Sequence, residues 1–121
     1  MTVAIRSASA CLPPAVDDAI EFMREHAADS ITIADIAAHS WVSVRTLQEG
    51  FQKHVGEPPL SVLRRIRLDR ARDELRAGDH YRQSVGTIAY RWGFGHPGRF
   101  ATAYKALFGE SPSSTLRASA S

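Results

Sequence analysis

Two polar side chains that lie three residues apart, Arg45 and Gln48, carry hydrogen-bonding groups that can read DNA base edges. Arginine can donate two hydrogen bonds to O6 and N7 of guanine, and glutamine can bond to both N6 and N7 of adenine. Residues three apart share one face of a helix, so both side chains can reach one groove if the segment is helical. Outside a suitable fold the pair would only be polar surface residues, and the surrounding elements decide between the two interpretations.

The pattern around this pair predicts two short helices joined by a tight turn. Ser43 is a typical N-cap for the helix that carries the pair. The apolar residues of this helix share one face: Leu47, Phe51 and Val55. Its polar residues lie outside that face: Arg45, Gln48, Glu49 and Gln52. A shorter helix with Ile33, Ile36 and Ala37 precedes it, capped by Thr32 and ended by His39-Ser40-Trp41. This is the outline of a helix-turn-helix.

Two further helices flank this motif. Pro13 and Pro14 open a first amphipathic helix with apolar residues at helical spacing: Val16, Ala19, Ile20, Met23 and Ala27. Pro58 and Pro59 open a longer helix over about residues 59–77, which Gly78 ends. The apolar positions of the long helix drift around its axis: Leu60, Leu63, Ile66, Leu68, Ala71 and Leu75. This drift predicts that the helix packs on different faces at its two ends.

The motif occurs twice. GEPPLSVLR at residues 56–64 and GESPSSTLR at residues 109–117 share six of nine letters at an offset of 53. Ile36-Ala37 matches Ile88-Ala89 at an offset of 52, so the second turn, WGFG at 92–95, is one residue longer. The helix after it opens at His96-Pro97 and is expected to bury three aromatic residues: Phe100, Tyr104 and Phe108. A solenoid is less favoured because its stability generally needs three or more repeats.

These patterns predict an all-α fold of about seven helices. Two helix-turn-helix lobes, residues 13–57 and 79–121, are joined by a linker helix over 58–78, and residues 1–12 form a flexible leader or linker. The linker helix, at about 18 residues and about 1.5 Å per residue, would be about 27 Å long. That length suits lobes placed about one DNA turn apart, so that a monomer reads two half-sites.

Composition sets limits on function. The chain has 121 residues, 44% of them hydrophobic, with a formal net charge of +2 and a pI of about 9.0, which tolerates an anionic partner without proving one. The one cysteine, Cys11, excludes an internal disulfide and fits a reducing cytosol, and no Cys/His cluster has zinc-finger spacing. The run Val3-Ala4-Ile5 is far shorter than an export signal. We therefore expect a cytoplasmic protein without a metal or cofactor.

Two other classes of function compete with DNA reading. Catalysis is disfavoured because the histidines are scattered over different elements and the sequence holds no phosphate-binding glycine loop, HExxH motif or nucleophile elbow. The alternative is a helical protein-interaction module that has lost specific DNA binding. Glu49, Trp41 and the few polar groups on the second recognition helix favour it. Strongly salt-dependent duplex binding would favour the DNA reader.

Residues 34–75, which include RIRLDRARDEL, and residues 85–117, which include IAYRWGF and YKALFGESP, resemble the DNA-binding domain of AraC/XylS-family bacterial transcription regulators. The resemblance covers about residues 14–118. It implies two lobes that each insert a recognition helix into double-stranded DNA. It also implies that such a domain lies C-terminal to an effector-binding or dimerisation domain and often activates transcription by contacting RNA polymerase. We expect this fragment itself to be monomeric and nucleoid-associated.

The resemblance and the helix pattern together give two sets of candidate residues. The base-reading candidates are Val44, Arg45, Gln48, Glu49, Gln52, His96, Arg99 and Thr102. The phosphate-contacting candidates are Ser43, Thr46, Lys53, His54, Arg64, Arg65, Gly98 and Lys105. Pro97, Gly98 and Ala101 stand where many relatives carry polar base readers, so the second lobe is expected to be the less specific.

Several of these assignments have a competing interpretation. Glu49 stands where relatives often carry arginine, and either accepts from a cytosine amine or repels phosphate. Arg99 reaches a base or only a phosphate, and the capping role of Ser43 would explain its presence by itself. Lys53, His54 and Lys105 either contact the DNA backbone or are solvated cations.

Other features of the two lobes have structural interpretations. The mixed charges of the linker helix are typical of a solvated, salt-bridged helix, in which Arg64 and Arg65 are the better phosphate candidates. Trp41 replaces a glycine common in relatives, and Gly50 inside a helix costs about 1 kcal/mol relative to alanine, so both put the rigidity of the first lobe in question. Trp92 and Phe94 are expected in the core.

Overall fold

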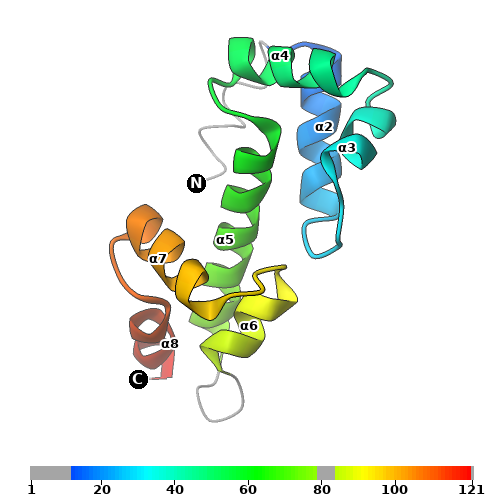
Figure 1. Cartoon of the computed structure of the whole chain (residues 1–121). Coiled ribbons are helices and arrows are strands. Elements are labelled where there is room, and N and C mark those ends of the chain that lie inside the picture. The colour runs from blue at the N-terminus through cyan, green and yellow to red at the C-terminus, as the bar shows by residue number, and fades with distance from the viewer. Residues whose placement is uncertain (1–11, 79–83, 121) are drawn as a thin grey trace. The chain divides into compact units, whose positions relative to one another are not determined.

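The computed structural model describes residues 12–78 and 84–120, and this part of the chain forms seven helices (Figure 1). They are α2 (Pro14–Glu25), α3 (Ile33–His39), α4 (Val44–His54), α5 (Pro59–Ala77), α6 (Val85–Arg91), α7 (Pro97–Phe108) and α8 (Pro112–Ala120). The predicted all-α fold is confirmed. Most of the predicted leader, including Cys11, lies outside the described residues, as does His80.

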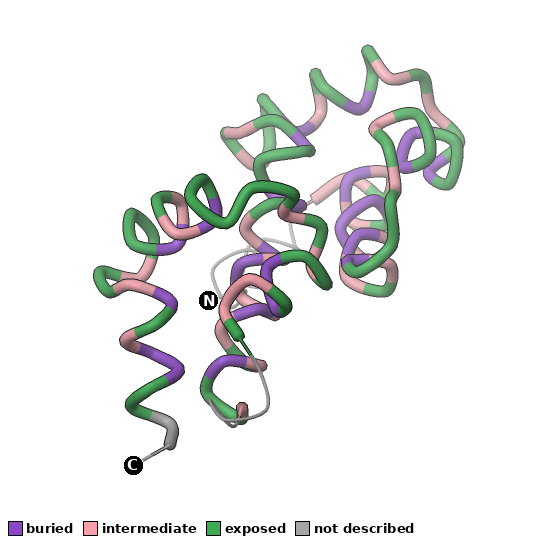
Figure 2. The backbone as a smooth tube through the Cα atoms, turned by 60° about the horizontal axis from the view of Figure 1, so that its bottom comes forward, coloured by how far each residue is buried: buried purple, intermediate pink, exposed green. Residues whose placement is uncertain are grey.

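The chain divides into two compact units, residues 1–66 and 67–121, and the division falls inside α5. In the first unit α2, α3 and α4 pack on one another. In the second, α6, α7 and α8 pack together around a cluster of buried side chains: Leu68, Ala71, Leu75, Ile88, Ala89, Phe100, Tyr104 and Leu116. Figure 2 shows buried residues recurring along the helices of each unit. Trp92 and Phe94 pack against this cluster of the second unit, as predicted for core residues.

Helix α5 contributes to both units. Leu68, Ala71 and Leu75 belong to the cluster of the second unit, whereas Leu63 and Ile66 are buried in the first. Leu60, the first of the apolar positions that drift around the helix, is not part of the core, because its side chain is 48% exposed. Val62 is buried instead. Leu60 lies in the first turn of α5, and its apolar side chain faces solvent.

Side-chain caps fix where several helices begin. The Thr32 hydroxyl accepts a hydrogen bond from the Asp35 amide (3.1 Å), and the Asp35 carboxylate accepts one from the Thr32 amide (2.9 Å), which completes a capping box. Ser43 caps α4 by accepting from the Thr46 amide (3.1 Å). Ser84 caps α6 in the same way. The predicted N-caps Thr32 and Ser43 are therefore confirmed.

The two helix-turn-helix turns share one backbone geometry. Trp41 has φ of 60° and Gly93 has φ of 88°, so both occupy the left-handed region. The residue after each donates a hydrogen bond to the preceding helix: Val42 to the Ala37 carbonyl (3.1 Å) and Phe94 to the Ala89 carbonyl (2.9 Å). The left-handed region disfavours residues with a Cβ and favours glycine. Trp41 is therefore strained, and its side chain is 92% exposed.

We expect Trp41→Gly to raise the free energy of unfolding by about 1 kcal/mol, because glycine adopts this conformation without the steric cost. Urea denaturation followed by circular dichroism measures the change. Trp41→Ala is the control, since it removes the exposed indole but keeps the Cβ. An equal gain in Trp41→Ala would show that the strain at this position is not the cause.

Gly50 has a packing role that the sequence did not reveal. A Cβ added at Gly50 would lie 3.1 Å from Cγ2 of Val16, so α4 and α2 approach closely at this point. Glycine at this position therefore lowers the helix propensity of α4, as predicted, but it also allows α4 to pack closely on α2. Alanine here would require Val16 to move by a few tenths of an ångström.

In the second unit, a series of hydrogen-bonded side chains occupies the positions that two apolar side chains occupy in the first unit. Tyr104 and Thr115 stand 53 residues after Phe51 and Val62, and all four are buried. The Thr115 hydroxyl donates to the Glu110 carboxylate, so the Tyr104 hydroxyl must donate to Thr115 (2.7 Å). Burial raises the pKa of Tyr104.

We expect Thr115→Val to lower the free energy of unfolding by about 1–3 kcal/mol, because it leaves the buried Tyr104 hydroxyl without this acceptor. The double variant Tyr104→Phe/Thr115→Val copies the first unit and should be more stable than Thr115→Val alone. Urea denaturation of the two single variants and the double variant forms a double-mutant cycle. Strictly additive losses would contradict this account.

Candidate nucleic-acid interface

Helix α4 presents the predicted base readers on its solvent face. Leu47 and Phe51 are buried at 1% and 0% exposure and anchor the opposite face. The exposed polar residues of the helix are Arg45, Thr46, Gln48, Glu49, Gln52, Lys53 and His54. Val44 is half-buried at the first position of the helix. The structure therefore places the base-reading candidates of the first lobe on one helix, and the side chains of Arg45 and Gln48 are both exposed to solvent.

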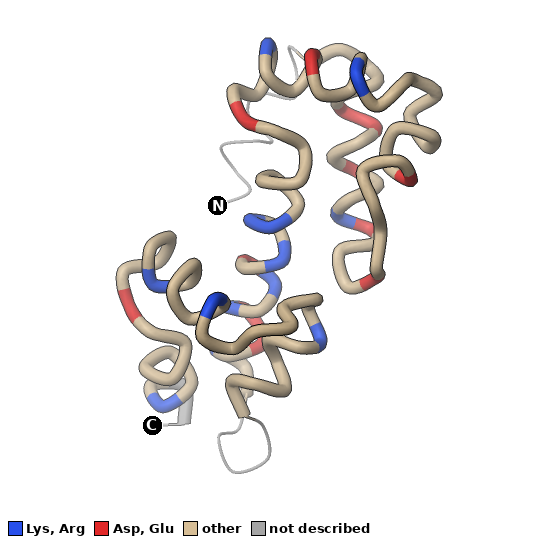
Figure 3. Tube along the Cα trace, in the orientation of Figure 1, with Lys and Arg blue, Asp and Glu red and all other residues tan. Residues whose placement is uncertain are grey.

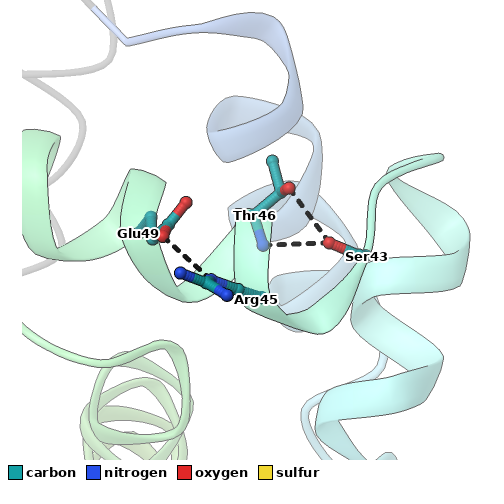
Figure 4. A network of polar contacts seen from close by, with 4 residues as sticks. All are labelled: Ser43, Arg45, Thr46 and Glu49. Atoms are coloured by element: carbon teal, nitrogen blue, oxygen red, sulfur yellow. Dashed lines mark hydrogen bonds and ion pairs between the residues drawn. The ribbon is translucent and has the colours of Figure 1, made fainter.

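The N-terminus of α4 is held by a local network (Figure 4). Besides accepting from the Thr46 amide, Ser43 donates from its hydroxyl to that of Thr46 (3.0 Å). The Thr46 hydroxyl acts as the acceptor in that bond, so its own proton can be donated elsewhere, as a phosphate contact requires. The capping role of Ser43 is shown, whereas its phosphate role stays a prediction.

Arg45 and Glu49 form an ion pair along α4, which the sequence analysis did not anticipate. Nε of Arg45 donates to Oε2 of Glu49 at 3.2 Å, and the two side chains are 87% and 66% exposed. Figure 4 shows the carboxylate and the guanidinium pointing toward each other. Their i,i+4 spacing was the signal that could have revealed the pair. Because both groups are solvated, the pair adds little to stability.

Helix α7 presents fewer polar groups. Its exposed candidates are His96, Gly98, Arg99, Thr102 and Lys105, and Ala101 is half-buried. The Thr102 hydroxyl donates to the Gly98 carbonyl (3.0 Å), so its proton is used within the helix. His96, the N-cap residue, makes no side-chain capping bond. Arg99, Lys105 and the N-cap residue His96 are thus the main hydrogen-bond donors at α7.

The basic residues of α5 differ in availability. The basic residues of this helix are all arginines, and they follow one another along it (Figure 3). Arg64 is exposed, whereas Arg65 is 33% exposed and paired with Glu57, which makes it the weaker phosphate candidate. Further along, the Arg72 guanidinium lies 4.4 Å from the centre of the Phe108 ring, and burial lowers the pKa of Arg67.

Glu74 of α5 joins this helix to the second turn. It accepts from Nε1 of Trp92 (2.8 Å) and pairs with Arg91. Several charges of α5 therefore have partners outside the helix, which the charge pattern alone did not indicate.

The sequence pattern also did not indicate that a tyrosine of α6 is exposed to solvent. Tyr90 of α6 is 79% exposed and lines a shallow depression with Ser84, Gly86, Thr87, Phe94, Gly95 and Pro97. Its position in the sequence, directly after the buried Ile88-Ala89 pair, was the available signal, because Tyr90 does not share the buried face of the helix with them.

Among the described residues, no group of three or more histidine, cysteine, aspartate or glutamate side chains is arranged to hold a metal ion. None of the described helices is long and apolar enough to span a membrane.

Comparison with known proteins places these features in context. Residues 24–118 match the family model of a helix-turn-helix domain. The chain is 45% identical over 106 residues to the "Probable thc operon regulatory protein" of Rhodococcus erythropolis, an alignment that covers 88% of this chain and 32% of that relative. The chain thus spans about a third of the length of this relative.

Two solved structures have the same fold. A probable AraC family transcriptional regulator from Rhodopseudomonas palustris CGA009 matches with a TM-score of 0.81 and 31% identity, over 88% of this chain and 98% of that one. The DNA-binding domain of AdpA, a global transcriptional factor crystallised in complex with a target DNA, matches with a TM-score of 0.75 and 25% identity. That alignment covers 88% of this chain and 93% of the AdpA domain.

Proposed function

Because the chain belongs to the AraC-type helix-turn-helix family of DNA-binding domains, we propose that α4 and α7 are its recognition helices and enter successive major grooves of one duplex. The observation that carries this proposal is the solvent face of α4. Two buried anchors hold the helix, and Arg45 and Gln48 project from it with the hydrogen-bonding groups that distinguish guanine and adenine. The DNA complex of the AdpA domain supports it.

The remaining candidates divide by chemistry. Val44 and Gln52 accompany Arg45 and Gln48 as base contacts on α4, and His96, Arg99 and Thr102 serve on α7. Glu49 lies among the α4 residues and is paired with Arg45, so its contribution to base reading depends on that pair. The groups that contact phosphate are Ser43, Thr46, Lys53, His54, Arg64, Gly98 and Lys105, and Arg65 joins them only if its pair with Glu57 opens. Phosphate contacts set the register of the protein on DNA, and base contacts supply its specificity.

In the cell we propose that this domain works within a bacterial transcription regulator in the cytoplasm. The Rhodococcus erythropolis relative is described as an operon regulatory protein and is about three times as long as the matched segment, which supports a partner domain that binds an effector or dimerises. Activation through contact with RNA polymerase is part of the same proposal. The isolated domain would bind DNA as a monomer.

Selection from a random duplex library with the purified chain tests the proposal, followed by titration of the selected duplex at several salt concentrations. We expect two boxes about one helical turn apart and an affinity that falls steeply with salt, because phosphate contacts release counterions. Sedimentation would show one protein per duplex. If no sequence is enriched and the binding of the chain to duplex DNA does not depend on salt, the result would contradict DNA reading and favour the protein-interaction module.

We further expect the DNA box that α7 contacts (the α7 box) to contribute less to sequence preference than the box that α4 contacts (the α4 box), because α7 offers fewer free hydrogen-bond donors. Randomising the α4 box should abolish most of the sequence preference, at about 1–3 kcal/mol per mismatched base pair. Randomising the α7 box should cost clearly less. Competition titrations with the two half-randomised duplexes measure both losses, and an equal or larger loss at the α7 box would contradict the asymmetry.

A further inference from the structure

The ion pair on α4 leaves the recognition end of Arg45 open. A guanidinium has five N–H donors, and Glu49 receives a hydrogen bond from the Nε group. The two Nη groups lie at the tip of the side chain, beyond the atom that Glu49 holds. A guanine presents its O6 and N7 acceptors side by side, which matches the spacing of the two Nη groups. The contact with Glu49 and an end-on contact with guanine can therefore exist together.

The pair also restricts Arg45 before any DNA is bound. An arginine that is 87% exposed would otherwise sample many rotamers, and binding a base would require it to give up that freedom. A carboxylate one helical turn further along α4 reduces the number of orientations that the guanidinium samples in the free protein. Part of the ordering needed for base recognition is then already present.

A second consequence is electrostatic. A lone arginine on a recognition helix is attracted to every phosphate that it meets, whatever the sequence. Glu49 offsets this charge locally, so nonspecific attraction at Arg45 is weakened. Contact with a guanine edge depends on hydrogen-bond geometry as well as charge and is less affected.

We propose that Glu49 is a positioning residue that aims Arg45 at guanine and suppresses its contact with phosphate, so that Glu49 determines specificity without touching a base. The inference rests on the proposed function, in which Arg45 reads a base pair of the first box. It replaces the two earlier interpretations of Glu49, a direct cytosine contact and simple repulsion of phosphate, by a role that acts through Arg45.

The test compares Glu49→Ala and Glu49→Gln with Arg45→Ala, the double variant Arg45→Ala/Glu49→Ala, and Glu25→Ala. Glu25, the exposed last residue of α2, is a control for the loss of one negative charge away from α4. Each protein is titrated with the selected duplex, with its three single-base variants at the Arg45 base pair, and with a random duplex. Circular dichroism establishes that every variant is folded.

We expect Glu49→Ala to reduce base preference at the Arg45 base pair by at least about three-fold, within the roughly 5-fold to 150-fold that a bidentate contact supplies. Its affinity for the random duplex should rise about two- to three-fold more than that of Glu25→Ala, with a steeper salt dependence. Glu49→Gln keeps an acceptor oxygen and should retain more of the preference than Glu49→Ala. In the Arg45→Ala background, Glu49→Ala should not change the preference.

Three results would overturn the inference, each in a different way. An equal gain on every duplex with no change in preference would mean that Glu49 only repels phosphate. A change in preference that persists in the Arg45→Ala background would mean that Glu49 contacts a base directly. If Arg45→Ala itself leaves the preference intact, the assignment of Arg45 fails, and the proposal about Glu49 fails with it.

Discussion

Phe100→Ala should lower the free energy of unfolding by about 3–5 kcal/mol, the range expected when a fully buried phenylalanine is truncated. Phe100 is 0% exposed, and its ring centre lies 5.0 Å from that of Phe94 and 5.6 Å from that of Tyr104. Truncation would remove both ring contacts and leave a cavity under α7. Urea denaturation monitored by circular dichroism measures the loss.

Leu107→Ala is the matched control, since Leu107 belongs to the same helix but is 43% exposed, and its loss should stay below about 1 kcal/mol. Because Phe100 directly follows Arg99, Phe100→Ala should also weaken binding to the α7 box, while preference at the α4 box persists. A loss of stability no larger than that of Leu107→Ala would show that the aromatic cluster does not support this helix as described.

The elements that the sequence predicts correctly depend on short spacings. Thr32 and Ser43 cap their helices because a hydroxyl next to the first helical turn can satisfy free amides, a relation that involves neighbours only. The repeat also locates the longer second turn, and the shared left-handed geometry of Trp41 and Gly93 agrees with that alignment. Local rules of this kind do not require knowledge of which elements meet.

What the sequence did not predict depends on packing between elements. Both Leu60 and Val62 are apolar, and only the tertiary fold decides that Val62 is buried. The closeness of Gly50 to Val16 requires the contact between α4 and α2. On α4, the i,i+4 spacing of Arg45 and Glu49 permits their pairing, but the sequence alone does not decide between this contact and separate contacts of each side chain with DNA.

Arg45→Ala should weaken binding to the selected duplex by about 1–3 kcal/mol and relax the preference at one base pair. The side chain is 87% exposed and its pair with Glu49 is solvated, so folding stability should change by no more than about 0.5 kcal/mol. The loss of affinity would therefore report on DNA contact. Fluorescence anisotropy with the selected duplex and its single-base variants measures both the loss and its dependence on sequence.

Lys53→Ala provides the comparison that separates base reading from phosphate contact, because Lys53 is an exposed cation in the last turn of the same helix. A phosphate contact should weaken binding uniformly across sequences and reduce the salt slope by about 1. We expect this behaviour from Lys53→Ala and a sequence-dependent loss from Arg45→Ala. If Arg45→Ala instead lowers the affinity for all duplexes equally, Arg45 contacts only the backbone, and Gln48 becomes the remaining bidentate reader on α4.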